Sequence, residues 1–370
     1  MRVLIAPDSF KGSLSSVEVA EALAEGWRRV RPGDEIALAP LADGGEGTLA
    51  AVEAAGGWER RLARARDPLQ RWIDAPWLRS IDGSNAYVEL AAASGLSRLA
   101  GHELDPIGAT THGTGDLLLA AMDAGVGHIV LGIGGSATTD GGRGILETFG
   151  AVVTEGPVGR DGLSVRLDLL DRRPAIVSMD VACDVTNPLL GPHGAAATYG
   201  PQKGASPAQV EALDARNEAW ADALEAATGN RVRDLPGAGA AGGVGFAMLC
   251  FANHFAGFAL RPGIELVMES VGFTQRLAAA DLVITGEGRI DAQTAFGKTA
   301  LGVARRAQDA GVRCIGVGGG VEPGGVEALA SVGASVVPVW ERALPVAEAM
   351  AAGAAPIIEC GARIARTVTD

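Results

Sequence analysis

Residues 128–142 read His-Ile-Val-Leu-Gly-Ile-Gly-Gly-Ser-Ala-Thr-Thr-Asp-Gly-Gly, an apolar run followed at once by a loop rich in glycine and hydroxyl groups. The run His128 to Leu131 is typical of a short buried strand. The loop Gly132 to Gly142 is a poor core segment, but glycine lets a backbone approach an anion closely. Two interpretations stay open from these residues: an anion-binding loop, or a tight turn in which the glycines serve backbone geometry only.

Similar units of strand, polar loop and helix occur at both ends of the chain. Near the N-terminus, the strand Arg2 to Ala6 precedes a helix whose predicted N-cap is Ser15, with Glu18 completing a capping box. Further segments follow the same pattern: strands at Glu35–Pro40, Asp281–Thr285, Arg313–Val317 and Ala334–Val339, and helices at Thr48–Ala55 and Thr299–Ala310. Such alternation predicts a parallel, helix-covered sheet built from both chain ends, with at least one insertion between them.

The middle of the chain is predicted to form that insertion. We expect short strands and turns from Trp58 to Arg79, where arginine and tryptophan accumulate. Beyond them we expect strands at Asn85–Leu90 and Pro174–Cys183 and helices at Gly113–Ala124 and Pro207–Thr228. Gly237 to Leu260 lacks charged residues, yet its glycine-rich start fits a buried helix entered through a loop better than a membrane span.

The expected fold class is therefore α/β. A length of 370 residues suits two domains with a cleft between them, because one core rarely grows beyond about 250 to 300 residues. The predicted domains are 1–60 plus 265–370, alternatively including 107–145, and an inserted second domain at 61–264. Binding residues are expected at the carboxyl ends of the strands.

Composition narrows the functional classes. The formal net charge of −13 argues against non-specific nucleic-acid binding, which uses basic patches. Neither a zinc site nor a disulfide framework is predicted, because Cys183, Cys250, Cys314 and Cys360 lie far apart with no C-x-x-C pair. The N-terminal apolar run is too short for a signal peptide, so we expect a cytoplasmic enzyme that does not enter a membrane.

Lysine is rare in this chain, and its positions are informative. Of 31 basic residues only Lys11, Lys203 and Lys298 are lysine, and each stands beside glycine. A compact ammonium suits contact with a phosphate in a way that a planar guanidinium does not. Chance in a glycine-rich chain is the alternative explanation.

Carboxylates gather in the same strand-end loops. They are Asp8, Asp43, Glu46, Asp140, Asp184, Glu287 and Asp291. Any one of them alone could be ordinary turn chemistry, but their repeated position beside glycine favours a shared site. Carboxylates, lysines and glycine-rich backbone together are what phosphoryl transfer requires: the carboxylates hold magnesium or take a hydroxyl proton, and the other groups neutralise phosphate oxygens.

Several standard motifs are absent or incomplete. Gly132, Gly134 and Ala137 match G-x-G-x-x-A, but a lone match is weak and the following Asp-Gly-Gly would interrupt the helix that this dinucleotide fingerprint needs. A P-loop ending at Lys298 is excluded because position 292 is alanine. No G-x-S-x-G motif and no metal-ligand spacing of histidines occur in the sequence.

Seven segments, in order, resemble the signatures of the type I glycerate kinases. They are Ala6-Pro-Asp-Ser-Phe-Lys-Gly-Ser-Leu, Ala42-Asp-Gly-Gly-Glu-Gly-Thr, Gly132-Ile-Gly-Gly-Ser-Ala-Thr-Thr-Asp-Gly-Gly, Ala182-Cys-Asp-Val-Thr-Asn-Pro-Leu, Gly200-Pro-Gln-Lys-Gly-Ala, Pro236-Gly-Ala-Gly-Ala-Ala-Gly-Gly and Ile284-Thr-Gly-Glu-Gly-Arg-Ile-Asp. The resemblance implies two α/β domains around a cleft, one with a Rossmann-like parallel sheet and the other an inserted mixed α/β domain. It also implies phosphorylation of D-glycerate to 2-phosphoglycerate with ATP and Mg²⁺. One departure is His112, where relatives commonly carry Tyr or Arg before Gly-Thr-Gly.

These observations give a hypothesis for each candidate residue. The catalytic candidates are Asp8, Lys11, Asp43, Asp184 and Arg289, where the fork-shaped Arg289 suits the glycerate carboxylate. The candidates for binding substrate or nucleotide are Ser9, Glu46, Gly134, Gly135, Ser136, Lys203, Glu287 and Lys298. Asp184 and Asp291 are the candidate Mg²⁺ ligands, with Asp43 as a further candidate, and the residues alone do not separate base from metal ligand.

The expected partners are glycerate and ATP, and the protein is expected to be a monomer or a homodimer. Two other functions stay open from the sequence. One is an NAD-dependent 2-hydroxy-acid dehydrogenase that uses the G-x-G-x-x-A match. The other is a non-catalytic sensor that binds sugar acids.

Overall fold

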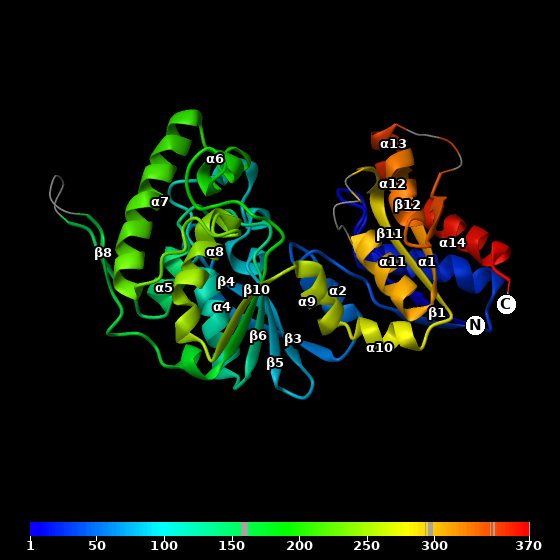
Figure 1. Cartoon of the computed structure of the whole chain (residues 1–370), viewed down its shortest axis with the longest axis horizontal. Coiled ribbons are helices and arrows are strands. Elements are labelled where there is room, and N and C mark those ends of the chain that lie inside the picture. Colours follow the sequence, from blue (N-terminus) through cyan, green and yellow to red (C-terminus); the bar gives the residue numbers. More distant parts are fainter. Residues whose placement is uncertain (157–161, 293, 295–298, 341, 343–344, 370) are drawn as a thin grey trace. The chain divides into compact units, whose positions relative to one another are not determined.

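The computed structural model describes residues 1–156, 162–292, 294, 299–340, 342 and 345–369. The chain divides into two compact units. Unit 1 consists of residues 1–43, 50–57 and 267–370, and unit 2 consists of residues 44–49 and 58–266. The segment Gly44 to Leu49 thus belongs to unit 2 although the residues on both sides of it belong to unit 1. Figure 1 shows the elements of each unit.

Unit 1 contains a parallel sheet built from both ends of the chain. Its strand order is β13-β12-β11-β1-β2, and each neighbouring pair runs parallel. The strands are β1 (Arg2–Ile5), β2 (Glu35–Leu38), β11 (Leu282–Ile290), β12 (Arg313–Val321) and β13 (Ser335–Pro338). Chain order runs outward in opposite directions from β1 and β11, so the switch point of this doubly wound sheet lies between these two strands.

Helices cover both faces of the unit 1 sheet. Successive side chains along each strand point to opposite faces, so both faces carry side chains that pack against helices. Val3, Ile5 and Ile284 join Trp27 and Ile364 in one core cluster, which places α1 and α14 on that face. The intervening residues of the strands face the other side, where α11 packs against β11 and β12. The helices of this unit are α1 (Ser16–Val30), α10 (Phe273–Ala278), α11 (Thr299–Ala310), α12 (Pro323–Ala330), α13 (Val346–Ala351) and α14 (Ala355–Thr367).

Two helices contain residues of both units. Helix α2 (Thr48–Ala54) begins in unit 2 and ends in unit 1, and α9 (Gly263–Ser270) does the same. The chain therefore changes unit inside a helix in both cases.

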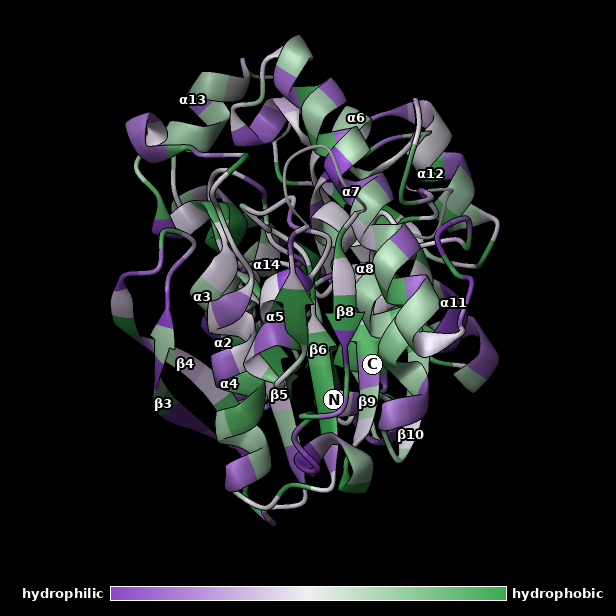
Figure 2. Cartoon of the chain, turned by 90° about the vertical axis from the view of Figure 1, so that its left-hand side faces the viewer, coloured by the Kyte–Doolittle hydropathy of each residue, from purple (hydrophilic) through white to green (hydrophobic). Residues whose placement is uncertain are grey.

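Unit 2 contains a mixed sheet in the order β10-β9-β6-β5-β4-β3. The strands are β3 (Trp58–Arg66), β4 (Trp72–Ser80), β5 (Asn85–Glu89), β6 (His128–Gly132), β9 (Ser178–Ala182) and β10 (Gly257–Arg261). From β5 to β10 the neighbours are parallel, whereas β4 is antiparallel to both β3 and β5. Figure 2 shows β6 largely hydrophobic and the edge strand β3 largely hydrophilic. This contrast fits a buried centre and an exposed edge.

Helices and a small hairpin complete unit 2. The helices are α3 (Ala91–Ser94), α4 (His112–Asp123), α5 (Arg143–Thr148), α6 (Ala195–Tyr199), α7 (Pro207–Thr228) and α8 (Ala240–Phe251). Strands β7 (Val152–Thr154) and β8 (Ser164–Arg166) pair with each other. Short 3-10 helices lie at Leu96–Arg98, Gly101–Glu103, Arg173–Ile176, Pro201–Lys203 and Ala252–His254.

The predicted fold class is confirmed: the chain is α/β, with a parallel sheet from both ends and a mixed sheet from the central strands. Three local predictions need correction. Trp58 to Arg79 contains two long antiparallel strands rather than short ones. The strand predicted from Pro174 begins only at Ser178, because the segment around Pro174 forms a 3-10 helix. After the predicted buried helix, Gly257 starts a strand of the sheet.

Candidate active site

Asp8 lies at the switch point of the unit 1 sheet. Its backbone N–H donates to the carbonyl of Gly286 on β11, at 2.8 Å, which continues the pairing of β1 with β11. The carboxylate accepts the Thr299 hydroxyl at 2.6 Å and the Ser9 backbone N–H at 2.6 Å. Burial raises the pKa of Asp8, and the negative charge of Asp43 acts in the same direction. A carboxyl group at the carboxyl ends of the strands thus has an increased affinity for a proton.

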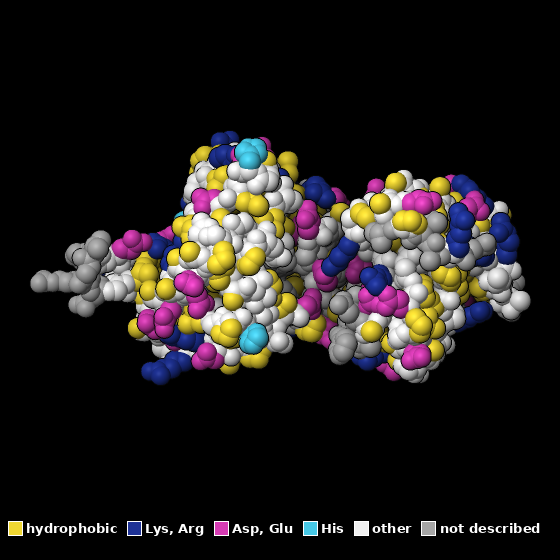
Figure 3. All heavy atoms as spheres, turned by 90° about the horizontal axis from the view of Figure 1, so that it is seen from above, with side chains coloured by type: hydrophobic (Ala, Val, Ile, Leu, Met, Phe, Trp, Pro, Cys, Tyr) yellow, Lys and Arg dark blue, Asp and Glu magenta, His cyan; other side chains and the backbone are white. Residues whose placement is uncertain are grey.

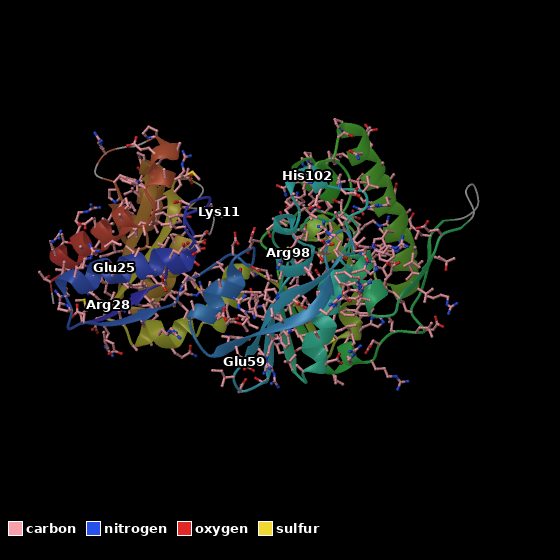
Figure 4. All side chains as sticks on the ribbon, turned by 180° about the vertical axis from the view of Figure 1, so that it is seen from behind. Lys11, Glu25, Arg28, Glu59, Arg98 and His102 are labelled. Atoms are coloured by element: carbon pink, nitrogen blue, oxygen red, sulfur yellow. The ribbon has the colours of Figure 1, made fainter. Side chains whose placement is uncertain are left out.

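Lys11 and Asp43 form an exposed pair close to Asp8. The Lys11 ammonium lies 3.5 Å from Asp43 Oδ2, and the two side chains are 83% and 52% exposed. Figure 4 labels Lys11 on the loop that follows β1. An exposed pair at this distance is weak, about 0 to 1 kcal/mol. The Lys11 ammonium can therefore turn toward an anion at little cost.

The end of β11 supplies the other candidates of unit 1. Glu287 is buried and accepts the hydroxyl of Thr294 at 2.6 Å. Arg289 is 65% exposed, and its guanidinium lies 3.4 Å from Asp291 and forms an ion pair with Glu322. Arg289 thus already has two acidic partners and would have to share or leave them to bind a glycerate carboxylate. Lys298 lies outside the described residues.

In unit 2, the first glycines of the loop 132–142 face the chain's own backbone. A Cβ atom at Gly132 would lie 2.5 Å from the carbonyl oxygen of Gly44, and one at Gly134 would lie 2.5 Å from Cα of Gly45. Real Cβ atoms essentially never come so close, so a side chain at either position would displace the segment 44–46. Gly132 and Gly134 thus allow the backbone of this segment to approach closely. The sequence alone did not reveal this contact.

Donors from helical segments hold the carbonyl side of the loop. Lys203 is 1% exposed, and its ammonium donates to Ser136 Oγ at 2.8 Å and to the Thr138 carbonyl at 2.5 Å. Arg216 donates to the Thr139 carbonyl at 3.0 Å, and Trp220 donates to the Gly141 carbonyl at 2.9 Å. Burial lowers the pKa of Lys203 to about 7. The Lys203 ammonium therefore stabilises the loop through these two hydrogen bonds.

The backbone N–H groups of the loop differ from its carbonyl groups in their hydrogen-bond partners. Within the described part of the chain, the backbone N–H groups of Gly134, Gly135 and Ser136 donate to no protein acceptor. Unpaired N–H groups in successive residues, next to a buried lysine, are suited to an anionic oxygen. The arrangement is compatible with the predicted anion-binding loop.

Asp140 has a structural position in this loop. Its carboxylate accepts the Thr111 N–H and hydroxyl, both at 2.8 Å, and the N–H groups of Gly142 and Gly144. It thereby joins the loop to the starts of α4 and α5. The neighbouring His112 places Nε2 3.0 Å from Glu147, so this ring is engaged within unit 2.

Asp184 and Glu46 lie on exposed chain at the same edge of the unit 2 sheet. Asp184 follows β9, and its Oδ1 accepts the Gly263 N–H at 2.9 Å, which links the ends of β9 and β10. Glu46 lies in the segment 44–49, and its Cβ is 3.8 Å from the position of a Cβ at Gly135. Both carboxylates are exposed.

Sequence reasoning missed one carboxylate at this edge. Glu89 ends β5 and pairs in register with Gly132, the first residue of the loop. It is 6% exposed, and its Oε1 accepts the Thr48 N–H at 3.0 Å. Burial raises the pKa of Glu89 to about 7. The signal that could have found it is the one used elsewhere, an acidic residue where a predicted strand ends.

The structure thus groups the candidates within each unit. Unit 1 holds Asp8, Ser9, Lys11, Asp43, Glu287, Arg289 and Asp291, and unit 2 holds Glu46, Gly134, Gly135, Ser136, Asp184 and Lys203. In both units most of them follow the carboxyl ends of parallel strands, as expected for α/β binding sites.

Three further observations concern metal ligands, membrane-spanning helices and surface charge. Among the described residues, no group of three or more His, Cys, Asp or Glu side chains could hold a metal ion. No described helix is long and apolar enough to cross a membrane. In the view of Figure 3, acidic and basic side chains are interspersed rather than gathered into one large basic patch.

Comparisons with known proteins agree on one family. The model of the glycerate kinase family matches residues 3–369. The chain is 41% identical to a glycerate kinase of Bacillus subtilis (strain 168), over 95% of each chain. It is also 41% identical to the glycerate 2-kinase of Escherichia coli (strain K12), over 91% of each chain. A crystal structure from Salmonella typhimurium LT2, of a protein proposed to be a glycerate kinase 2, has a TM-score of 0.84 at 39% identity and covers 99% of this chain and 98% of that one.

Proposed function

This chain belongs to the glycerate kinase family, and from that premise we propose that it phosphorylates the 2-hydroxyl of D-glycerate in a Mg²⁺-dependent reaction. Glycerate kinase activity and the use of ATP come with the family. The choice of the 2-hydroxyl is carried by the similarity to the enzyme of Escherichia coli, which is a glycerate 2-kinase.

The proposed reaction is an in-line phosphoryl transfer. The 2-hydroxyl oxygen of glycerate bonds to the γ-phosphorus of ATP, the bond from that phosphorus to the β–γ bridging oxygen breaks, and ADP leaves. The hydroxyl proton passes to a carboxylate. Asp8 suits this last role because its raised pKa makes it a better proton acceptor near neutral pH than an ordinary aspartate.

The other candidates have complementary roles. Lys11 neutralises the transferring phosphoryl group, which its exposed ammonium allows. The unpaired N–H groups of Gly134, Gly135 and Ser136 bind an anionic oxygen of the substrate or nucleotide, with Lys203 behind them. Arg289 binds the glycerate carboxylate after exchanging an acidic partner. We propose substrate or nucleotide contacts also for Ser9, Glu46, Glu287 and Lys298.

Mg²⁺ fits the donor set of this chain. Protein kinases and ATPases usually hold Mg²⁺ by one or two carboxylates together with substrate phosphates and water. This fits the absence of any group of three potential ligands from the described residues. The candidate carboxylates for Mg²⁺ are Asp184 in unit 2 and Asp291 in unit 1, with Asp43 as a further candidate. When bound, Mg²⁺ supplies charge neutralisation at the phosphate oxygens.

The experiment measures ADP release by purified protein with D-glycerate, with and without Mg²⁺, and identifies the product by phosphorus NMR. We expect ADP release that requires both additions and a signal from 2-phosphoglycerate. A product phosphorylated at the 3-hydroxyl would overturn the assignment of the position. No ADP above background from folded protein would overturn the kinase function; hydride-linked absorbance would then support the dehydrogenase, and binding without turnover the sensor.

A further inference from the structure

The segment Gly44 to Leu49 crosses the carboxyl edge of the unit 2 sheet. Its Gly44 carbonyl lies over Gly132 at the end of β6, and Gly45 lies over Gly134. A Cβ at Gly44 would lie 2.7 Å from Cβ of Ala182, the last residue of β9. The segment therefore lies against the ends of two neighbouring parallel strands, and only residues without side chains fit at these contacts.

Glu89 holds the other end of this segment. Its buried carboxyl group accepts the Thr48 N–H at 3.0 Å, and the nearby backbone of Gly47 and Leu49 favours its ionised form. The carboxyl group of Glu89 thus ties the backbone of the segment to the end of β5 at Thr48. Thr48 also closes the segment on itself, because its hydroxyl donates to the Gly45 carbonyl at 2.6 Å.

The segment carries or adjoins two residues proposed for the reaction. Glu46 lies within it, and Asp43 is the residue directly before it in the chain. Glu89 itself is buried beneath the segment and is not exposed to a substrate. Its effect on catalysis would therefore pass through the segment.

We propose that Glu89 is a positioning residue that latches the segment Gly44–Leu49 onto the carboxyl edge of the unit 2 sheet and thereby sets the position of Glu46 and Asp43 during phosphoryl transfer. The catalytic part of this inference rests on the proposed roles of Glu46 and Asp43. The latch itself rests only on the contacts within unit 2.

Two kinds of variant test the latch, one at Glu89 and one at Gly134, where the loop contacts the segment. Glu89→Gln keeps the size of the side chain and removes its charge, and Glu89→Ala removes the acceptor altogether. Gly134→Ala leaves Glu89 intact but places a methyl group where Gly45 lies. The matched controls are Asp82→Asn, whose carboxylate accepts the Ser84 N–H at the opposite end of β5, and Gly127→Ala, at the opposite end of β6, where a Cβ meets only the Ser84 carbonyl at 3.9 Å.

The first readout is hydrogen exchange in peptides that cover residues 44–49. We expect exchange there to rise at least tenfold in Glu89→Ala and Gly134→Ala and less in Glu89→Gln, while β5 and β6 keep their protection. The controls should exchange like the wild type. Unchanged exchange of residues 44–49 in all three variants would overturn the latch, whatever the activity.

The second readout separates kcat from KM. We expect kcat to fall about tenfold in Glu89→Gln and further in Glu89→Ala, with the KM for glycerate and for ATP within threefold of wild type, because a misplacement of about 1 Å can cost up to a hundredfold in rate. Faster exchange with unchanged kcat would overturn the positioning role. If the wild type shows no kinase activity, the proposed function fails, and the exchange measurement still decides the latch.

Discussion

Lys11 combines high exposure with a weak ion pair, and this makes its charge available to a phosphate. We expect Lys11→Arg to lose most of kcat although the charge is kept, because a planar fork cannot place its charge where a compact ammonium does. Steady-state kinetics of ADP release will measure this. Arg28→Lys on the outside of α1 (Figure 4) is the control for exchanging the two residue types. Near-wild-type turnover of Lys11→Arg would contradict the phosphate contact.

Glu89 makes the stability of the fold depend on pH in a definite direction. Burial raises the pKa of Glu89 from the ordinary glutamate value of 4.5 to about 7 in the folded chain, so the folded state binds the proton more tightly than the unfolded state. The stabilising contribution is complete below pH 4.5 and is lost as the pH rises through 7. The full shift corresponds to about 3 kcal/mol.

The measurement for Glu89 compares urea unfolding of the wild type and Glu89→Gln from pH 5 to pH 8. We expect the free energy of unfolding of the wild type to fall relative to the variant over this range. A difference that does not change with pH would contradict the raised pKa.

At the scale of single residues, sequence patterns predicted what depends on near neighbours. The capping box of Ser15 and Glu18 is present as predicted, because both partners lie within one turn of the chain. Asp140 and Glu89 also bind distant partners, Thr111 and Thr48, which lie 29 and 41 residues away. No local pattern identifies such partners, so sequence placed Asp140 among the carboxylates of a shared site and overlooked Glu89.

The loop 132–142 behaves as one element held by its carbonyl groups. We expect Lys203→Met to leave the Thr138 carbonyl without its donor, at a cost of about 1 to 3 kcal/mol for an unsatisfied buried group. Because the loop then loses its support, peptides covering 133–139 should exchange faster and kcat/KM should fall at least tenfold.

Hydrogen exchange and steady-state kinetics measure both effects of Lys203→Met. Gln209→Ala, in the first turn of α7 near Lys203 in sequence, is the control: it removes a capping acceptor for Ser206 without touching the loop. Wild-type exchange of the loop in Lys203→Met would show that Lys203 is not its support.

Helices were the elements that sequence predicted best. Helices α7 and α11 begin and end at the predicted residues, and the capping box of Ser206 marks the start of α7. Strand β11 runs five residues further than predicted, through Gly286 and Gly288, and β12 runs four residues further, through the glycines 318–320. There the pairing of the two backbones maintains the strand, and a run of glycine carries no strand signal. The loop glycines were recognised, but their contact with 44–45 depends on folding of the whole unit.

At the scale of the molecule, each unit has a sheet and a core of its own. Trp27 is fully buried in the core of unit 1, where its indole N–H also donates to Asp34 at 3.0 Å. We expect Trp27→Ala to lower the stability of unit 1 by about 3 to 5 kcal/mol, the usual cost of such a truncation. The core of unit 2 contains none of the atoms removed.

Calorimetry together with hydrogen exchange will show how the loss is distributed. We expect Trp27→Ala to lower the temperature of the calorimetric transition of unit 1. The backbone amides of β6 and β9 should keep their protection against hydrogen exchange. Trp72→Ala, at a position that is 57% exposed on β4, should change neither. Equal loss of protection in both units would mean that they unfold as one cooperative body.

The pairing of β1 with β11 also bears on the order in which the protein is made. Val3 lies next to Leu282 in the sheet, so β1 has no β11 beside it until translation has passed Leu282. The sheet of unit 2 is complete once β10 has emerged at Arg261, before β11 exists. Domains generally fold as units during synthesis. Unit 2 is thus able to fold before unit 1, whose sheet is complete only after β11, β12 and β13 have been translated.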